Sequence, residues 1–138
     1  MTYLLDTNAC IAIINGNPPR IRSRLDRALS SGADVCVSSV VLFELWYGVA
    51  KSARRANAKR IELFMSGPIA PLPFDDADAQ SAGQLRAELE SAGKPIGAYD
   101  VLIAGQALRH SFTLVTANAR EFRRIKSLAW QDWADPYD

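Results

Sequence analysis

The chain contains few of the side chains that most often build hydrolytic or zinc sites. Its 138 residues include one histidine, His110, and two cysteines, Cys10 and Cys36. This scarcity excludes a zinc site made from His and Cys clusters, a two-histidine metal site and a histidine-based hydrolytic triad. Both cysteines lie in apolar stretches, so we expect buried thiols in a reducing cytoplasm rather than a disulfide.

The chain also lacks an apolar run long enough to cross a membrane and a basic leader at its start. We therefore expect a cytoplasmic protein that has no membrane partner. Hydrophobic residues make up 49% and charged residues 22% of the composition, which is ordinary for a globular protein. A chain of this length is expected to form one domain, which we predict to span residues 1–138.

A strong net charge is absent as well, since the formal value is +1. The basic residues nevertheless gather in three clusters, and such clusters can bind phosphate without a high isoelectric point. Taken singly, each cluster is more simply explained as a solvated helix face. The clusters are Arg20, Arg22, Arg24 and Arg27; then Lys51, Arg54, Arg55, Lys59 and Arg60; then Arg120, Arg123, Arg124 and Lys126.

Three long stretches without other charges each contain a single carboxylate. Asp6 is the only charged residue in 1–19, Glu44 the only one in 35–50, and Asp100 the only one in 95–108. Asp100 alone could cap its helix, because Asp favours helix N-termini. Three such acids instead indicate one shared acidic pocket, because a buried carboxylate is costly unless it is paired or bound to metal.

Short apolar strands alternate with helical patterns along the whole chain, which predicts a parallel sheet flanked by helices. Because ligands bind at the carboxyl edge of such sheets, we expect Asp6, Glu44, Asp100 and Asn118 to converge there. The expected strands are 2–5, 35–37, 69–72 and 112–115, with an edge strand at 128–130. The expected helices are 9–14, 21–29, 40–51, 54–65, about 76–92, 98–108 and 119–124.

Local details of these helices are also predicted. Thr7 or Asn8 should cap the first helix, and Ser38 or Ser39 the third. The long helix should begin at Asp75 or Asp76, point Ala79, Ala82, Leu85 and Leu89 inward, and stop at Gly93. Asp75, Asp76 and Asp78 are left out of the site, because a helix start stabilises acids by its dipole.

The segment 43–49 is unusually apolar and aromatic, with Phe43, Leu45, Trp46, Tyr47 and Val49. One interpretation is that part of the segment lines a groove for a partner helix. The interpretation that we favour is that all of it belongs to the core, because aromatic stripes are usually buried.

Four motifs resemble the PIN-domain family of metal-dependent ribonucleases, and within it the VapC toxins of toxin–antitoxin pairs. They are LLDTN at 4–8, SSVVLFELWYG at 38–48, GKPIGAYDVLIAGQAL at 93–108 and LVTANAREFRRI at 114–125. Each motif alone is weak, but four in this order are highly specific. The resemblance implies an α/β fold, a PIN-like three-layer α/β/α sandwich with a central, mostly parallel sheet of four to five strands.

The same resemblance implies the site. Asp6, Glu44 and Asp100 match the family's principal acids and would be catalytic ligands of Mg²⁺ or Mn²⁺. Asn118 stands where many members carry a fourth acid, so the site would contain three carboxylates and this amide in place of four carboxylates. Further positions expected near the pocket are Thr7, Asn8 and Thr116, with a secondary chance for Glu121.

The expected activity is hydrolysis of RNA phosphodiester bonds, in a structured RNA such as a tRNA, by a metal-activated water that leaves a 5′-phosphate. The resemblance also implies growth inhibition, a homodimer, and a hetero-oligomer with a VapB-like antitoxin. An antitoxin arginine that reached Asp6 or Glu44 would displace the metal.

Three alternatives remain. A haloacid-dehalogenase-type phosphatase also carries Asp after its first strand, but it needs a second Asp two residues on, where this chain has Asn8. A receiver domain has an acidic pocket too, but its phosphoacceptor strand and downstream Lys are not evident. A non-catalytic PIN-like partner of a DNA-binding antitoxin is disfavoured by the three retained acids.

Overall fold

The structure is a computed structural model, and it describes residues 1–137. Within that range the chain forms one five-stranded sheet in the order β3-β2-β1-β4-β5. Every neighbouring pair of strands is parallel. The strands are β1 (Thr2–Leu5), β2 (Asp34–Ser38), β3 (Ala70–Leu72), β4 (Thr113–Val115) and β5 (Trp130–Gln131). The predicted parallel α/β sheet is therefore confirmed, although the last strand begins two residues later than expected.

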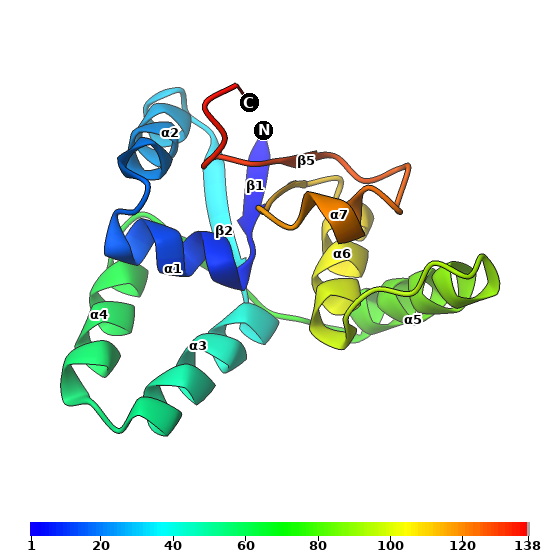
Figure 1. The fold of residues 1–138 in the computed structure, drawn as a ribbon, viewed down its shortest axis with the longest axis horizontal. Coiled ribbons are helices and arrows are strands. Elements are labelled where there is room, and N and C mark those ends of the chain that lie inside the picture. Colours follow the sequence, from blue (N-terminus) through cyan, green and yellow to red (C-terminus); the bar gives the residue numbers. More distant parts are fainter. Residues whose placement is uncertain (138) are drawn as a thin grey trace.

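Helices connect the strands and fall close to the predicted ranges. Helices α3 and α4 form a helical hairpin, which projects from the body of the molecule (Figure 1). The helices are α1 (Thr7–Asn15), α2 (Pro19–Ser30), α3 (Ser39–Ser52), α4 (Arg55–Ser66), α5 (Asp76–Ser91), α6 (Ala98–His110) and α7 (Ala119–Phe122). None of the helices within residues 1–137 is long and apolar enough to span a bilayer.

The strand order fixes which face of the sheet each helix covers. The chain moves outward from β1 through β2 to β3, then returns past β1 to β4 and continues to β5. Because parallel crossovers are right-handed, α1 to α4 cover one face and α5 to α7 cover the other. Figure 1 shows these two groups on either side of the strands. Strands β1 and β4 therefore form the topological switch point, whose carboxyl ends bind ligands in open α/β sheets.

The core is built from the central strands and the apolar α6. Leu4 and Leu5 of β1 and Leu114 of β4 have no exposed surface. Helix α6 packs very closely on α5: a Cβ atom added at Gly105 would lie 2.5 Å from Cα of Ala82. The central residues of α6, Val101 and Ile103 to Ala107, are buried.

Two local predictions are wrong. The first helix is capped by Asp6, whose Oδ1 accepts a 2.8 Å hydrogen bond from the Ala9 amide, and not by Thr7 or Asn8. In α5, Ala79 is exposed. The inward face of α5 instead begins at Asp78, since Asp78, Ala82, Leu85 and Leu89 repeat at spacings of four and three residues and all are buried.

The contacts of Asp78 explain why the inward face of α5 was predicted wrongly. Its side chain is fully buried, and its Oδ1 accepts a 2.7 Å hydrogen bond from Nε of Arg109 at the end of α6. Asp75 forms a capping box with Asp78 and also pairs with Arg109 at 3.0 Å. These acids therefore stay outside the candidate site, as predicted, but Asp78 joins α5 to α6 in addition to stabilising the start of a helix.

Candidate active site

Asp6 lies where β1 ends and α1 begins. Its side chain is 5% exposed, and the hydrogen bond to the Ala9 amide orients it. The buried hydroxyl of Thr116, which follows β4, also stabilises the Asp6 carboxylate and lowers its pKa. Because Thr116 also accepts a 2.9 Å hydrogen bond from the Asn118 amide, it connects the ends of the two central strands.

Glu44 reaches the same edge from the second turn of α3. Ser38, at the end of β2, caps this helix by accepting a 3.1 Å hydrogen bond from the Val40 amide. Oγ1 of Thr7 then donates a 2.8 Å hydrogen bond to Oε1 of Glu44. This contact joins residues 37 positions apart and holds the half-buried Glu44 next to the start of α1.

Asp100 enters from the first turn of α6 and does not cap the helix, because its N-cap is Gly97, which makes no side-chain cap hydrogen bond. Nδ2 of Asn118 donates to Oδ2 of Asp100 at 3.3 Å and to Oε2 of Glu121 at 3.1 Å. The Gly97 amide also donates to Oε2 of Glu121, at 3.4 Å. Asn118 thus bridges two acids, and Glu121 belongs to the same group of side chains.

The electrostatics show that these acids crowd one another. Burial, helped by Glu121 and by the charges of Asp6 and Glu44, raises the pKa of Asp100 from 3.8 to about 7. Burial also raises the pKa of Asp6, and the charges of Glu44 and Asp132 raise it further. The hydrogen bond with Asp100 lowers the pKa of Glu121, because it stabilises the Glu121 carboxylate. The pocket therefore favours a bound proton or cation over free carboxylates.

The donor set suits a hard divalent cation. Carboxylate and amide oxygens are the usual ligands of Mg²⁺ and Mn²⁺, and the pocket offers them without sulfur or imidazole nitrogen. Within residues 1–137, no three His, Cys, Asp or Glu side chains already stand close enough to chelate one ion. The like charges oppose such an approach, and a cation would remove that opposition.

Sequence reasoning gave Glu121 only a secondary place near the pocket and did not single out Asp132. Glu121 contacts Asn118 and the Gly97 amide, and Asp132 raises the pKa of Asp6 from just beyond β5. A polar residue directly after a strand was the signal available for Asp132. Of the other expected neighbours, Asn8 is exposed and lines, with Thr116 and Asp132, a cavity of about 30 Å³.

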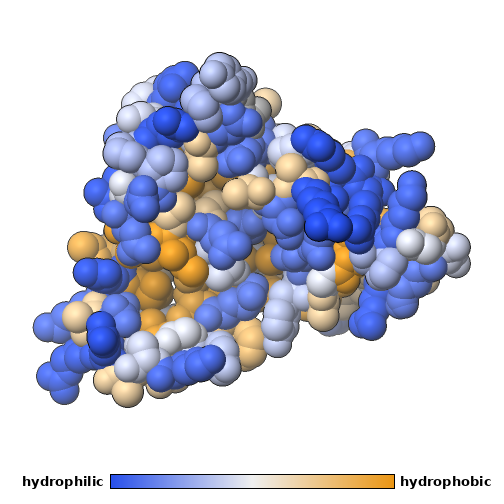
Figure 2. All heavy atoms as spheres, in the orientation of Figure 1, coloured by the Kyte–Doolittle hydropathy of each residue, from blue (hydrophilic) through white to orange (hydrophobic). Residues whose placement is uncertain are grey.

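An apolar groove of about 230 Å³ lies between α1, α3 and α4. Figure 2 shows hydrophobic side chains gathered in this recess. Glu44 lines one part of the groove and also borders the acidic pocket, so the two sites are continuous. The remaining lining residues are Ile11, Ile14, Asn15, Leu45, Gly48, Val49, Asn57, Arg60 and Ile61.

The favoured prediction that the whole of 43–49 is core is therefore wrong. Leu45 is buried, but Phe43, Trp46 and Tyr47 are 54%, 40% and 59% exposed. The structure supports the other prediction, in which this segment contributes to a groove: Leu45 and Val49 line it.

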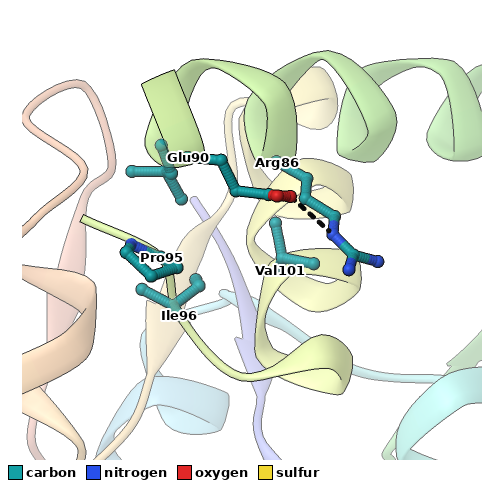
Figure 3. Close-up of a pocket in the computed structure, with 6 residues that line it drawn as sticks. Arg86, Glu90, Pro95, Ile96 and Val101 are labelled. Atoms are coloured by element: carbon teal, nitrogen blue, oxygen red, sulfur yellow. Dashed lines mark hydrogen bonds and ion pairs between the residues drawn. The ribbon is translucent and has the colours of Figure 1, made fainter. Parts of the chain in front are cut away.

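A second pocket, of about 240 Å³, lies between the end of α5 and the segment before α6 (Figure 3). Leu89, Pro95, Ile96 and Val101 line it, and its charged pair is an exposed Arg86–Glu90 ion pair at 3.3 Å. Asp6, Glu44 and Asp100 do not line it. Within residues 1–137, the only carboxylate that lines this pocket is Glu90, which is already paired with Arg86, so the pocket does not suit a metal ion.

The basic clusters include residues with structural contacts. Arg22 donates to the carbonyls of Ile13 and Ile14, and Arg20 donates to the carbonyl of Ala134. Arg124 donates to the Pro95 carbonyl in the segment that leads into α6. These contacts join α2 to the end of α1 and to the segment after β5, and the segment after α7 to the segment before α6. The first and third clusters are therefore only partly available to hold phosphate.

Acids at the switch point of a parallel sheet are compatible with several kinds of enzyme, and comparison with known proteins identifies the family. The profile of the PIN domain matches residues 3–128. The chain therefore belongs to the PIN domain family.

Similar proteins lie in the VapC branch of that family. The tRNA(fMet)-specific endonuclease VapC of Shigella flexneri is 42% identical over 97% of this chain and 99% of its own length. Ribonuclease VapC2 of Rickettsia felis is 39% identical over 96% of this chain and 98% of its own. The resemblance inferred from the four motifs is thus confirmed.

Solved structures agree. A chain in the crystal structure of DNA-bound VapBC from Salmonella typhimurium superposes with a TM-score of 0.87 at 41% identity, over 96% of this chain and 98% of that one. A chain of VapBC-5 from Mycobacterium tuberculosis, a member of the VapBC family of toxin–antitoxin systems, superposes with a TM-score of 0.67 at 26% identity, over 94% and 96%. The predicted PIN-like α/β/α sandwich is confirmed.

Proposed function

We propose that this protein is a divalent-metal-dependent endoribonuclease that acts as the toxin of a VapBC-type pair. The observation that carries the proposal is the group of interacting acids at the switch point: Asn118 bridges Asp100 and Glu121, and burial, Glu121 and the charges of Asp6 and Glu44 raise the pKa of Asp100 to about 7. Near-full-length similarity to proteins named ribonuclease VapC supports the reaction class.

We assign the metal to Asp6, Glu44 and Asp100, with Glu121 and Asn118 completing the set. Mg²⁺ or Mn²⁺ bound there would lower the pKa of a water and stabilise charge on the attacked phosphate. In the reaction, a water oxygen bonds to phosphorus, the bond from phosphorus to the 3′ oxygen breaks, and the water's protons pass to the 3′ oxygen and to solvent. The products are a 5′-phosphate and a 3′-hydroxyl.

The chain's own residues position these groups. Thr7 holds Glu44 in place through its 2.8 Å hydrogen bond, and Thr116 holds Asp6. Asn118 keeps Asp100 and Glu121 together while adding no charge of its own. The only histidine, His110, lies 3.3 Å from Asp78 on the α5–α6 contact and is therefore engaged away from the pocket.

We propose a structured RNA of the tRNA class as the substrate, because the relative from Shigella flexneri carries that name. The test is cleavage of a purified tRNA pool in Mn²⁺, in EDTA, and in EDTA with Mn²⁺ restored. Cleavage should require the ion, and Asp6→Asn and Asp100→Asn should stay folded and lose activity. Cleavage that persists after rigorous chelation would refute the metal assignment, and no cleavage in any condition would favour a non-catalytic partner.

We propose that the groove between α1, α3 and α4 receives an apolar helix of the antitoxin. The groove offers Ile14, Leu45 and Ile61 for its apolar face, and Glu44 places a carboxylate where a basic antitoxin side chain can reach it. Inhibition by that antitoxin should weaken as Mn²⁺ increases, because both compete for Glu44. Inhibition that no Mn²⁺ concentration shifts would mean that the antitoxin only blocks RNA entry.

The homodimer and the cytoplasmic location remain proposals of the same kind. Sedimentation equilibrium of the purified protein tests the first, and cell fractionation tests the second. A growth arrest that depends on Asp100 after induction would tie the ribonuclease activity to toxicity.

A further inference from the structure

Two aromatic side chains stand on the surface beside the acidic pocket. Phe43 is 54% exposed and Tyr99 is 46% exposed. Their rings contact each other, with centroids 5.7 Å apart and planes inclined by 48°. Isolated exposed aromatic residues are common and need no explanation. A contacting pair from two helices, residues 56 positions apart, is a more specific arrangement.

Each of these aromatic residues immediately precedes a pocket acid in the sequence. Phe43 directly precedes Glu44 on α3, and Tyr99 directly precedes Asp100 in the first turn of α6. Successive residues on a helix point about 100° apart, so each ring leaves its helix in a different direction from its acid. Glu44 turns to Thr7 and Asp100 turns to Asn118. The rings therefore meet at the rim of the pocket, where α3 and α6 pack together.

The chemistry of this rim is selective. The rings offer flat, uncharged surface, whereas the neighbouring acids repel anionic groups that bring no cation. A nucleobase is flat and uncharged, and it is attached one sugar away from a phosphate. Aromatic side chains bind unpaired bases by stacking, with little dependence on base identity.

We infer that Phe43 and Tyr99 form a stacking platform for one unpaired base beside the phosphate that is cut. The inference rests on the proposed ribonuclease function and deepens it, because it requires the substrate to present an unstacked nucleotide at the cleavage position. A loop, bulge or single strand meets that requirement, and a continuous RNA duplex does not.

The test uses the full-length protein, Mn²⁺ and a single-stranded oligoribonucleotide that the parent cuts. Phe43→Leu and Tyr99→Leu should each raise KM about tenfold and leave kcat nearly unchanged, because stacking binds substrate and transition state alike. Phe43→Trp offers a larger ring and should lower KM. Tyr47→Leu, which removes a ring of 59% exposure from the same helix, is the matched control and should leave both constants unchanged.

A second arm assigns the effect to a base. In oligoribonucleotides with one abasic position, the parent should lose affinity when the missing base adjoins the cut, and Tyr99→Leu should lose nothing further on that substrate. Additive losses would overturn the inference. Leucine variants that keep the parent's KM would also overturn it. A loss of activity that follows a change in oligomeric state would overturn it as well, because Phe43 and Tyr99 would then form a contact between copies of the chain.

The two proposals can fail separately. If the parent cuts no RNA, the proposed function fails and the platform with it. If the parent cuts RNA and the leucine variants leave KM unchanged, only the platform fails.

Discussion

Replacing Asp100 with asparagine should stabilise the metal-free protein near neutral pH. The pKa of Asp100 is about 7 in the folded protein, against an ordinary value of 3.8. Between those values the native state holds a proton that the unfolded chain has released, so the parent's free energy of unfolding falls as pH rises through this window. An asparagine side chain at this position would carry no such penalty, because it never ionises.

The size of the effect follows from the shift. A difference of one pKa unit corresponds to about 1.4 kcal/mol, so the full shift would correspond to about 4 kcal/mol. Asp100 is only half-buried, and solvent screening reduces such a value. We therefore expect Asp100→Asn to gain about 1–3 kcal/mol at pH 7.5. The gain should disappear near pH 4, where the folded parent is protonated and the unfolded chain is becoming so.

The assay is urea unfolding of parent and variant in EDTA at a series of pH values from 4 to 8, followed by Mn²⁺ titration at pH 7.5. The parent should gain stability from Mn²⁺, because an ion that binds only the native state stabilises it by mass action. The variant should gain less. Equal pH dependence of the two proteins in EDTA would refute the crowded-carboxylate description of this pocket.

Four further substitutions test other parts of the structure. Asp78→Asn should lower the free energy of unfolding by about 2–4 kcal/mol at pH 7, because Asp78 is buried against Arg109. The pKa of Asp78 is lowered in the folded protein, so this loss should shrink as pH falls below about 4, whereas the effect of Asp100→Asn grows as pH rises above that value. Urea unfolding at several pH values measures both. Gly105→Ala should lower stability by about 1–3 kcal/mol through overlap with Ala82, whereas Gly83→Ala, in open space on a helix, should add about 0.5–1 kcal/mol. Asn118→Asp should tighten Mn²⁺ binding in calorimetry, and unchanged affinity would place Asn118 outside the metal shell.

The sequence alone determined the fold class and singled out three candidate acids. Strand-like and helical patterns alternate, and this alternation needs only local periodicity to be read. Asp6, Glu44 and Asp100 stood out because each is the only charge in a long stretch of uncharged residues. Long uncharged stretches are usually buried, and burying a lone carboxylate is costly, so an acid inside one is conspicuous before any contact is known.

Tertiary structure decided which other residues join them. Glu121 lies within the basic cluster of Arg120, Arg123 and Arg124 and resembles any surface acid until the fold places it beside Asn118 and the Gly97 amide. Asp132 looked like part of a polar tail, yet its charge reaches Asp6 because β5 pairs with β4.

Tertiary structure also decided which apolar residues stay exposed. Phe43 carries the same hydrophobic character as Leu45, but only the contacts of α3 with α1, α4 and α6 settle that Leu45 is buried and Phe43 reaches the rim of the pocket. The periodicity of the sequence indicates which face of a helix is apolar. How much of that face is covered depends on neighbours that lie far away in the chain. Those neighbours are set by the crossovers of the sheet, which no local pattern contains.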